Sequence, residues 1–160
     1  MVLRMRAPGE HCLRIGRWSE PGRVYLLTFA TANRRPLFRD WSLAAPASAV
    51  IGVCATWHDG RLLAWVLMPD HCHVLVEVGA IVPLSTLVAR AKAKSARCVG
   101  RARGGLGRIW QRGYHDHAVR REEDLVDFAR YVVANPLRAG LVRRLGDYPY
   151  WNAIWFGGQR

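Results

Sequence analysis

The fold is decided by two neighbouring stretches of the sequence, Arg61-Leu-Leu-Ala-Trp-Val-Leu-Met68 and Cys72-His-Val-Leu-Val-Glu-Val78. Both stretches are apolar and rich in residues that favour β-strands. Only a short connection around Pro69-Asp70 separates them, and strands joined by so short a connection are antiparallel neighbours. The sequence therefore predicts an antiparallel hairpin inside a larger sheet.

The segments on either side of this hairpin predict alternating helices and strands. In chain order, they are a strand over 24–31, a helix over 42–58 that stops at Asp59-Gly60, a helix over 84–99, a flexible basic loop over 101–107, a short strand over 117–120 and an amphipathic helix over 122–135 that Pro136 terminates. This order predicts an α+β sandwich of the ferredoxin-like or RRM-like kind, with a central antiparallel sheet and helices on one face.

Length and composition predict one globular domain. The chain has 160 residues, of which 51% are hydrophobic, and this is enough for a real core. Pro and Gly interrupt residues 1–22 too often for a long regular element, so we expect a basic N-terminal arm there and a single domain over 23–160. No stretch approaches the roughly 18 to 20 apolar residues of a membrane span, and we expect a cytoplasmic protein without membrane contact. The four cysteines form no C-x-x-C pair, which gives no indication of a structural zinc site.

The charge of the chain points towards a polyanionic partner. Lys and Arg number 24 against 12 Asp and Glu, a formal net charge of +12. Such a field attracts nucleic acid, although an arginine-rich composition alone is also what a GC-rich genome produces. The distribution is more informative, because only Asp116 opposes the ten basic residues between Arg90 and Arg121. The acidic group that follows, from Glu122 to Asp127, is typical of a helix start.

The most distinctive local pattern is His71-Cys72-His73 at the start of the second hairpin strand. Residues two apart in a strand point to the same face, so both imidazoles can converge on one ion while Cys72 points into the core. Two neutral imidazoles suit several transition metals, whereas magnesium needs oxygen ligands in addition. The alternative is that the histidines are ordinary polar residues at a strand edge, and the pattern alone leaves both interpretations open.

A second candidate pair is Tyr131 and Asn135 on the last predicted helix. Residues four apart lie about 6 Å apart along a helix on the same face, so the phenol and the amide can address one site. The alternative for Tyr131 is a core aromatic residue, and for Asn135 a C-terminal helix cap.

Three longer motifs resemble a known family. The stretch Met68-Pro-Asp-His-Cys-His-Val-Leu-Val76 resembles the HUH motif of single-tyrosine transposases, in which U is a hydrophobic residue. The stretches from Trp110 to Arg120 and from Tyr131 to Val142 resemble the C-terminal signature of the REP-associated tyrosine transposases, which are linked to repetitive extragenic palindromes. The resemblance runs from about Val24 to Trp151. Insertion-sequence relatives commonly carry glutamine where Asn135 stands, which favours the REP-associated branch.

The resemblance implies an enzyme that nicks and rejoins single-stranded hairpin DNA. It implies that Tyr131 is the nucleophile and forms a 5′-phosphotyrosine intermediate, and that His71, His73 and Asn135 bind Mg²⁺ or Mn²⁺. A cation on a non-bridging oxygen would withdraw charge from the phosphodiester as the pentavalent state forms. The active unit would be a monomer or a homodimer that exchanges the Tyr131 helix.

Further polar residues are candidates for assisting Tyr131 and for contacting DNA. Tyrosine has an unperturbed pKa near 10, so a nearby base or cation should assist its deprotonation; the candidates are Asp70, His115 and His117. For the two histidines, hydrogen bonding that fixes the strand is an equally good interpretation. The residues expected to contact DNA phosphates and bases are Arg34, Arg35, Arg101, Arg103 and Arg112.

Three alternatives remain open at the level of sequence. The same sandwich could be a non-catalytic module that binds single-stranded nucleic acid, although the aromatic signature of an RRM is missing. It could be a metal-dependent hydrolase that activates water and leaves no protein on the product. It could also be a dedicated insertion-sequence transposase with the same chemistry.

Overall fold

The computed structural model describes residues 19–105, 107–120 and 124–156. Most of the arm expected over 1–22 lies outside the described residues, and that arm stays a prediction. No helix in the described ranges is both long enough and apolar enough to cross a membrane.

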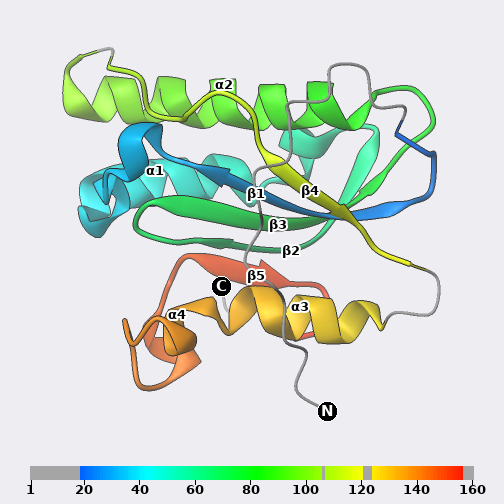
Figure 1. Ribbon diagram of the computed structural model, residues 1–160. Helices are drawn as coiled ribbons and strands as arrows, with labels where there is room; N and C mark the ends of the chain where they lie inside the picture. The colour runs from blue at the N-terminus through cyan, green and yellow to red at the C-terminus, as the bar shows by residue number, and fades with distance from the viewer. Residues whose placement is uncertain (1–18, 106, 121–123, 157–160) are drawn as a thin grey trace.

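A five-stranded antiparallel sheet forms the centre of the molecule (Figure 1). Its strands are β1 (Val24–Ala30), β2 (Gly60–Leu67), β3 (His71–Val78), β4 (His115–Ala118) and β5 (Trp151–Ala153). Their order across the sheet is β4-β1-β3-β2-β5. The predicted hairpin is β2 and β3, and β3 holds the central position. The α+β fold with a central antiparallel sheet is therefore confirmed, while the edge strand β5 adds to the predicted elements.

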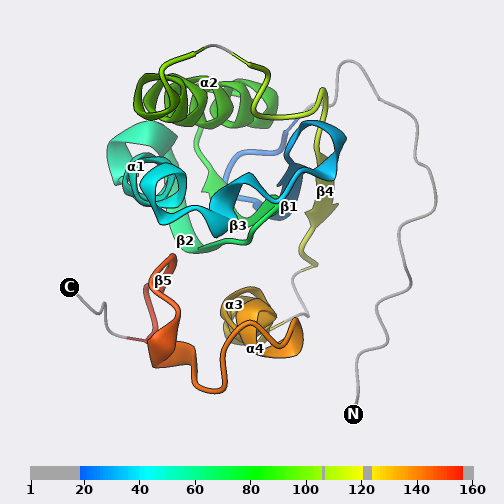
Figure 2. The same cartoon turned by 90° about the vertical axis from the view of Figure 1, so that its left-hand side faces the viewer.

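Helices cover both faces of this sheet (Figure 2). Helices α1 (Trp41–Ile51) and α2 (Leu84–Arg103) lie on one face, and α3 (Leu125–Val133) and α4 (Asn135–Arg138) lie on the other. We call these the α1–α2 face and the α3 face. The prediction of helices on one face is wrong in this respect.

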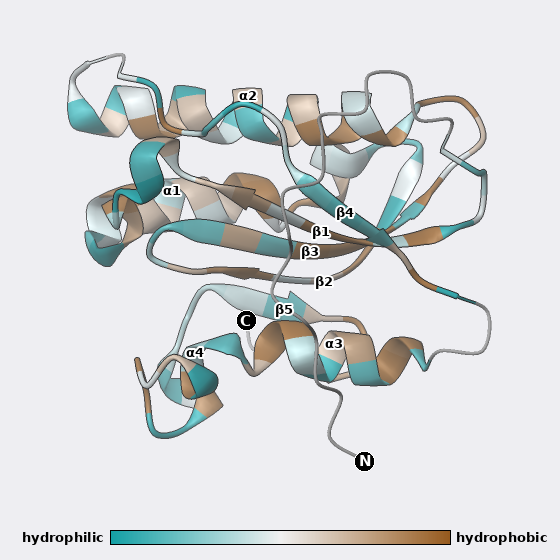
Figure 3. Cartoon of the chain, viewed as in Figure 1, coloured by the Kyte–Doolittle hydropathy of each residue, from teal (hydrophilic) through white to brown (hydrophobic). Residues whose placement is uncertain are grey.

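The apolar strands explain why both faces are covered. From Leu62 to Leu67 every residue of β2 is buried, and a strand that is apolar on both sides must be covered on both sides. Two hydrophobic cores result: Leu27, Phe29 and Cys72 belong to the core under α1 and α2, whereas Leu26, Val66 and Leu75 pack with α3. The hydropathy of the sheet and its covering helices can be followed in Figure 3.

Several predicted elements have different bounds in the structure. The short strand expected over 117–120 is β4, which begins two residues earlier at His115 and ends at Ala118. The helix expected over 42–58 ends at Ile51, and the short 3-10 helix η3 (Cys54–Trp57) follows. The residue after α1 is Gly52, where a Cβ atom would lie 2.6 Å from the ring of Trp65 on β2. The loop expected over 101–107 begins later, because α2 continues to Arg103 and ends at Gly104, whose φ is +68°.

The described part of the chain also contains the 3-10 helices η1 (Ala32–Arg34), η2 (Leu37–Arg39) and η4 (Leu145–Asp147). In η1, Asn33 and Arg34 both adopt left-handed φ angles, +57° and +53°, which non-glycine residues rarely do. The buried Thr31 holds this turn, since its amide donates to the carbonyl of Asp70 at 2.8 Å and its hydroxyl donates to that of Arg35 at 2.7 Å. The turn after β1 is thereby tied to the turn before β3.

Candidate active site

The two histidines of β3 converge on one point of the α3 face. Their Nε2 atoms lie 3.1 Å apart, while Cys72 between them is fully buried in the core on the opposite face. Strand alternation produces this arrangement, as the sequence predicted. The two imidazoles therefore offer two nitrogen atoms to the same small volume.

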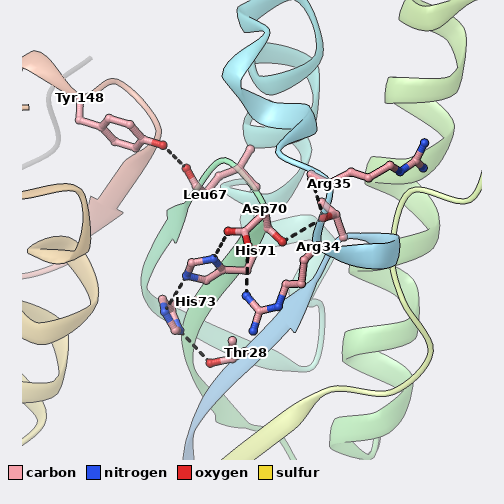
Figure 4. Close-up of polar contacts among 9 residues, drawn as sticks. Thr28, Arg34, Arg35, Leu67, Asp70, His71, His73 and Tyr148 are labelled. Carbon is pink, nitrogen blue, oxygen red and sulfur yellow. Dashed lines mark hydrogen bonds and ion pairs between the residues drawn. The ribbon is translucent and has the colours of Figure 1, made fainter. Parts of the chain in front are cut away.

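The other ring nitrogen of each histidine, Nδ1, hydrogen-bonds to a polar partner (Figure 4). His71 donates from Nδ1 to the carboxylate of Asp70 at 2.6 Å, and the Nδ1 atom of His73 lies 2.7 Å from the hydroxyl of Thr28 on β1. A carboxylate can only accept, so the Nε2 atom of His71 carries a lone pair. Such second partners orient the histidines of metal sites and select their tautomer.

The electrostatics of the site keep His73 neutral and Asp70 ionised. Burial, together with the neighbouring His71 imidazole and the positive charges of Arg34 and Arg138, lowers the pKa of His73 to about 3. Burial alone would raise the pKa of Asp70, but the hydrogen bond from His71 and the positive charge of Arg34 hold it below its usual value. At neutral pH the site therefore presents a neutral imidazole beside a fixed carboxylate.

Tyr131 of α3 faces this pair. The centroids of its ring and of the His73 ring are 6.2 Å apart, and the ring is only partly buried at the edge of the α3 core. The end of the last long helix and the start of β3 thus meet, although about 60 residues separate them in the sequence. A phenol, which can act as a nucleophile, stands beside two imidazoles.

Asn135 lies one helical turn after Tyr131, but it begins α4 instead of ending α3. Its Nδ2 atom donates to the carbonyls of Tyr131 at 2.9 Å and Val132 at 3.1 Å. These bonds satisfy two carbonyls at the end of α3 and leave the oxygen Oδ1 as the other polar end of the amide. Asn135 therefore caps a helix, and it can still offer an oxygen ligand.

The donor set fits a divalent ion only if oxygen atoms join the histidines. Among the residues that the structure describes, no group of three or more His, Cys, Asp or Glu side chains could hold a metal. The pair of imidazoles supplies two nitrogen ligands, and Mg²⁺ or Mn²⁺ prefers oxygen for the rest. Asn135 and a DNA phosphate are chemically suitable sources, so the metal assignment stays a prediction.

Residues 23–135 match the family model described as transposase, IS200-like. The chain belongs to the IS200-like transposases. It is 30% identical over 139 residues to a protein of Haemophilus influenzae assigned as a REP-associated tyrosine transposase, and the alignment covers 81% of this chain and 78% of the relative. The REP-associated tyrosine transposase of Escherichia coli is 26% identical over 87 residues, 54% of this chain and 50% of that protein. The resemblance to the REP-associated branch is therefore confirmed.

Solved structures share the fold of this IS200-like transposase. A REP-associated tyrosine transposase bound to a REP hairpin superposes with a TM-score of 0.65 at 22% identity, covering 88% of this chain and 82% of that one. A protein of Deinococcus radiodurans assigned as a transposase gives a TM-score of 0.54 at 24% identity, covering 75% of this chain and 95% of that one. At these identities the likeness supports the fold alone.

The two histidines of β4 lie on the α3 face of this transposase. In the sheet Thr28 pairs with His73 on one side and with His115 on the other, and directly paired residues share a face. Both β4 histidines are exposed, and His117 stacks on Phe128 of α3 with ring centroids 5.8 Å apart. The stacking supports a structural role for His117, and the proposed acid–base role of either histidine stays a prediction.

The five arginines predicted to bind DNA are spread over the molecule. Arg34 lies at the site, where its Nη1 atom is 3.3 Å from Asp70. Arg35 donates to the carbonyls of Ala32 and Arg108 and so ties the backbone together. Arg112 is exposed before β4, whereas Arg101 and Arg103 are exposed on α2, which packs on the opposite face. The structure therefore brings only Arg34 into contact with the histidine network.

Two residues of the site were missed by sequence reasoning. Thr28 holds His73, and its signal was a polar residue within the apolar strand 24–31. Arg138 lies over the Tyr131 ring, with its Cζ atom 4.7 Å from the ring centroid. The sequence indicated Arg138 only by its position seven residues after Tyr131, which corresponds to two helical turns along the same face.

Proposed function

We infer that this transposase cleaves and rejoins single-stranded DNA beside a hairpin, with Tyr131 as its covalent nucleophile. The observation that carries this proposal is the position of the Tyr131 ring, 6.2 Å from His73, next to two imidazoles whose Nε2 atoms converge. Membership of the transposase family and the phosphate-attracting charge of +12 support the choice of DNA as substrate.

His71, His73 and the amide oxygen of Asn135 are the residues we propose to hold Mg²⁺ or Mn²⁺. When bound, the ion would supply positive charge to a non-bridging oxygen of the scissile phosphate. The Thr28 hydroxyl can hydrogen-bond to either tautomer of His73, because a hydroxyl both donates and accepts. It donates to Nδ1 while the Nε2–H of His73 bonds to His71, and it accepts from Nδ1–H when that Nε2 carries a lone pair.

The proposed reaction is a transesterification in which bonds and protons balance. The Tyr131 oxygen attacks phosphorus, its new bond to phosphorus forms, and the bond from phosphorus to the 3′-oxygen breaks. The phenol gives up one proton and the departing 3′-oxygen gains one. The 5′-phosphotyrosine conserves the phosphoester bond, so attack by a 3′-hydroxyl rejoins DNA without a nucleotide cofactor.

The form of the DNA is proposed from the comparisons. The REP-associated relative of known structure is bound to a REP hairpin, and we propose a hairpin with a single-stranded flank as the substrate here. Of the five arginines predicted to contact DNA, Arg34 follows β1 and Arg112 precedes β4, two strands of the site. Their guanidinium groups suit phosphate contacts.

The test is a cleavage assay with hairpin DNA labelled in its single-stranded flank, in the presence of Mg²⁺ or Mn²⁺. We expect a labelled product that stays attached to protein in a denaturing gel, and we expect Tyr131→Phe to abolish it. Tyr150→Phe removes the same atom from another partly buried tyrosine and should leave the product unchanged. Cleavage without attached protein would indicate water as the nucleophile, and binding without cleavage would indicate a binding module; either result contradicts the proposal.

A further inference from the structure

Arg138 lies over one face of the Tyr131 ring. Its guanidinium carbon lies 4.7 Å from the ring centroid, and its side chain belongs to an exposed residue at the end of α4. Within the described part of the chain, Arg138 forms no salt bridge with a carboxylate. Its charge is therefore directed at the tyrosine and not neutralised by an acid.

The break between α3 and α4 places this arginine. Asn135 closes α3 through its bonds to Tyr131 and Val132, and the backbone of Arg138 then bonds to Ala134 at 3.0 Å. Helical side chains tilt towards the N-terminus of their helix, so Arg138 reaches back over the preceding turns. Gly140, with a φ of +67°, ends the short helix directly afterwards.

Two arginines thus flank the histidine pair from different elements. Arg34 of η1 contacts Asp70, which bonds to His71, and Arg138 of α4 lies over the Tyr131 ring, which stands beside His73. Arg34 is partly neutralised, because its Nη1 atom lies 3.3 Å from Asp70. Arg138 has no carboxylate partner among the residues that the structure describes, so its two terminal nitrogens are available to an incoming anion.

We propose that Arg138 binds the non-bridging oxygens of the scissile phosphate and holds the Tyr131 ring in line for attack. This inference rests on the proposed function. A planar guanidinium matches two phosphate oxygens at once and stays protonated throughout the reaction. Negative charge on those oxygens grows as the pentavalent state forms, so a fixed cation stabilises that state more than the ground state. Its contact with the ring face leaves the phenolic oxygen free to react.

The first experiment compares three variants in single-turnover cleavage at saturating hairpin DNA. Arg138→Ala should lower the rate by about 10²-fold or more, as the loss of one transition-state donor typically does. Arg138→Lys should restore part of the rate, because it keeps the charge and loses the fork. The matched control is Arg130→Ala, because Arg130 is an exposed arginine next to Tyr131 in the sequence and is already paired with Asp127. This variant should cleave at the rate of the parent chain.

The second experiment removes the charge from the phosphate instead of from the protein. With a neutral methylphosphonate at the scissile linkage, Arg138→Ala should cost nothing further, because its partner is gone. If that strand is not cleaved at all, affinities measured in the Tyr131→Phe background decide: Arg138→Ala should weaken binding of the native strand and not of the neutral one.

Equal effects of Arg138→Ala on both strands, or no effect on the native strand, would overturn the role of Arg138. If the parent chain forms the Tyr131-linked product and Arg138→Ala forms it equally well, only this inference is refuted. A parent chain that never forms the product would refute the proposed function itself.

Discussion

At the scale of single residues, the hydrogen bond between Thr28 and His73 orients one of the two histidines that we propose as metal ligands. We predict that Thr28→Val, which keeps the shape and removes the hydroxyl, weakens metal binding by about 10- to 100-fold, as loss of a second partner of a metal-bound histidine typically does. The measurement is cleavage rate against Mn²⁺ concentration. Thr86→Val on the exposed side of α2 is the control, and equal metal dependence in both variants would contradict the prediction.

The lowered pKa of His73 predicts how the stability of the fold depends on pH. Its pKa is lowered from 6.5 to about 3 in the folded chain, so between these values the unfolded chain binds one proton more. Stability contributed by the neutral imidazole is therefore complete above about pH 6.5 and is lost as the pH falls towards 3. At pH 5 we expect a loss of about 1 to 2 kcal/mol relative to pH 7.

The measurement is urea unfolding at both pH values with the metal chelated. His73→Gln should show a smaller difference between pH 7 and pH 5 than the parent chain does. An unchanged pH dependence in His73→Gln would mean that His73 is not held neutral by its surroundings.

At the scale of elements, the position of α1 depends on a glycine. A Cβ atom at residue 52 would lie 2.6 Å from the Trp65 ring of β2, and Trp65 is buried. Gly52→Ala should therefore lower the free energy of unfolding by about 1 to 3 kcal/mol, the usual cost of overpacking. Gly146→Ala, where an added Cβ meets nothing within 4 Å, is the control in the same urea titration. Two equally stable variants would show that Trp65 has room to move.

The sequence predicted these elements where periodicity was strong and missed them where it was short. The hairpin, both long helices and the amphipathic α3 follow from alternation or from 3.6-residue spacing. The three residues of β5 and the four of α4 are too few to show a period. Their positions depend on the strand or helix against which they pack, which lies elsewhere in the sequence.

At the scale of the whole molecule, the sheet divides the basic residues between two faces. The Tyr131 site and Arg34 lie by the α3 face, whereas Arg101 and Arg103 lie on α2 across the sheet. We predict that Arg34→Ala lowers both DNA affinity and the cleavage rate at saturating DNA. The double variant Arg101→Ala and Arg103→Ala should weaken binding and retain the saturated rate, since those side chains are remote from the reacting atoms.

Salt titration of affinity in the Tyr131→Phe background checks this division. Each lost contact to a single-stranded phosphate should reduce the slope of log affinity against log salt by about 0.7. If the α2 variant leaves both the slope and the affinity unchanged, α2 does not contact DNA, and the prediction for Arg101 and Arg103 is wrong.

Taken by itself, the sequence determined everything that a local repeat can specify. Strand alternation placed His71 and His73 on one face with Cys72 on the other, and helical spacing placed Tyr131 near Asn135, because backbone geometry sets these relations within a few residues. Only the tertiary structure decided that α3 covers the face opposite α1 and α2, that Thr28 holds His73, and that Arg138 lies over Tyr131. Both faces of the sheet are apolar, so no local signal states which helix covers which face; packing between distant segments makes that choice.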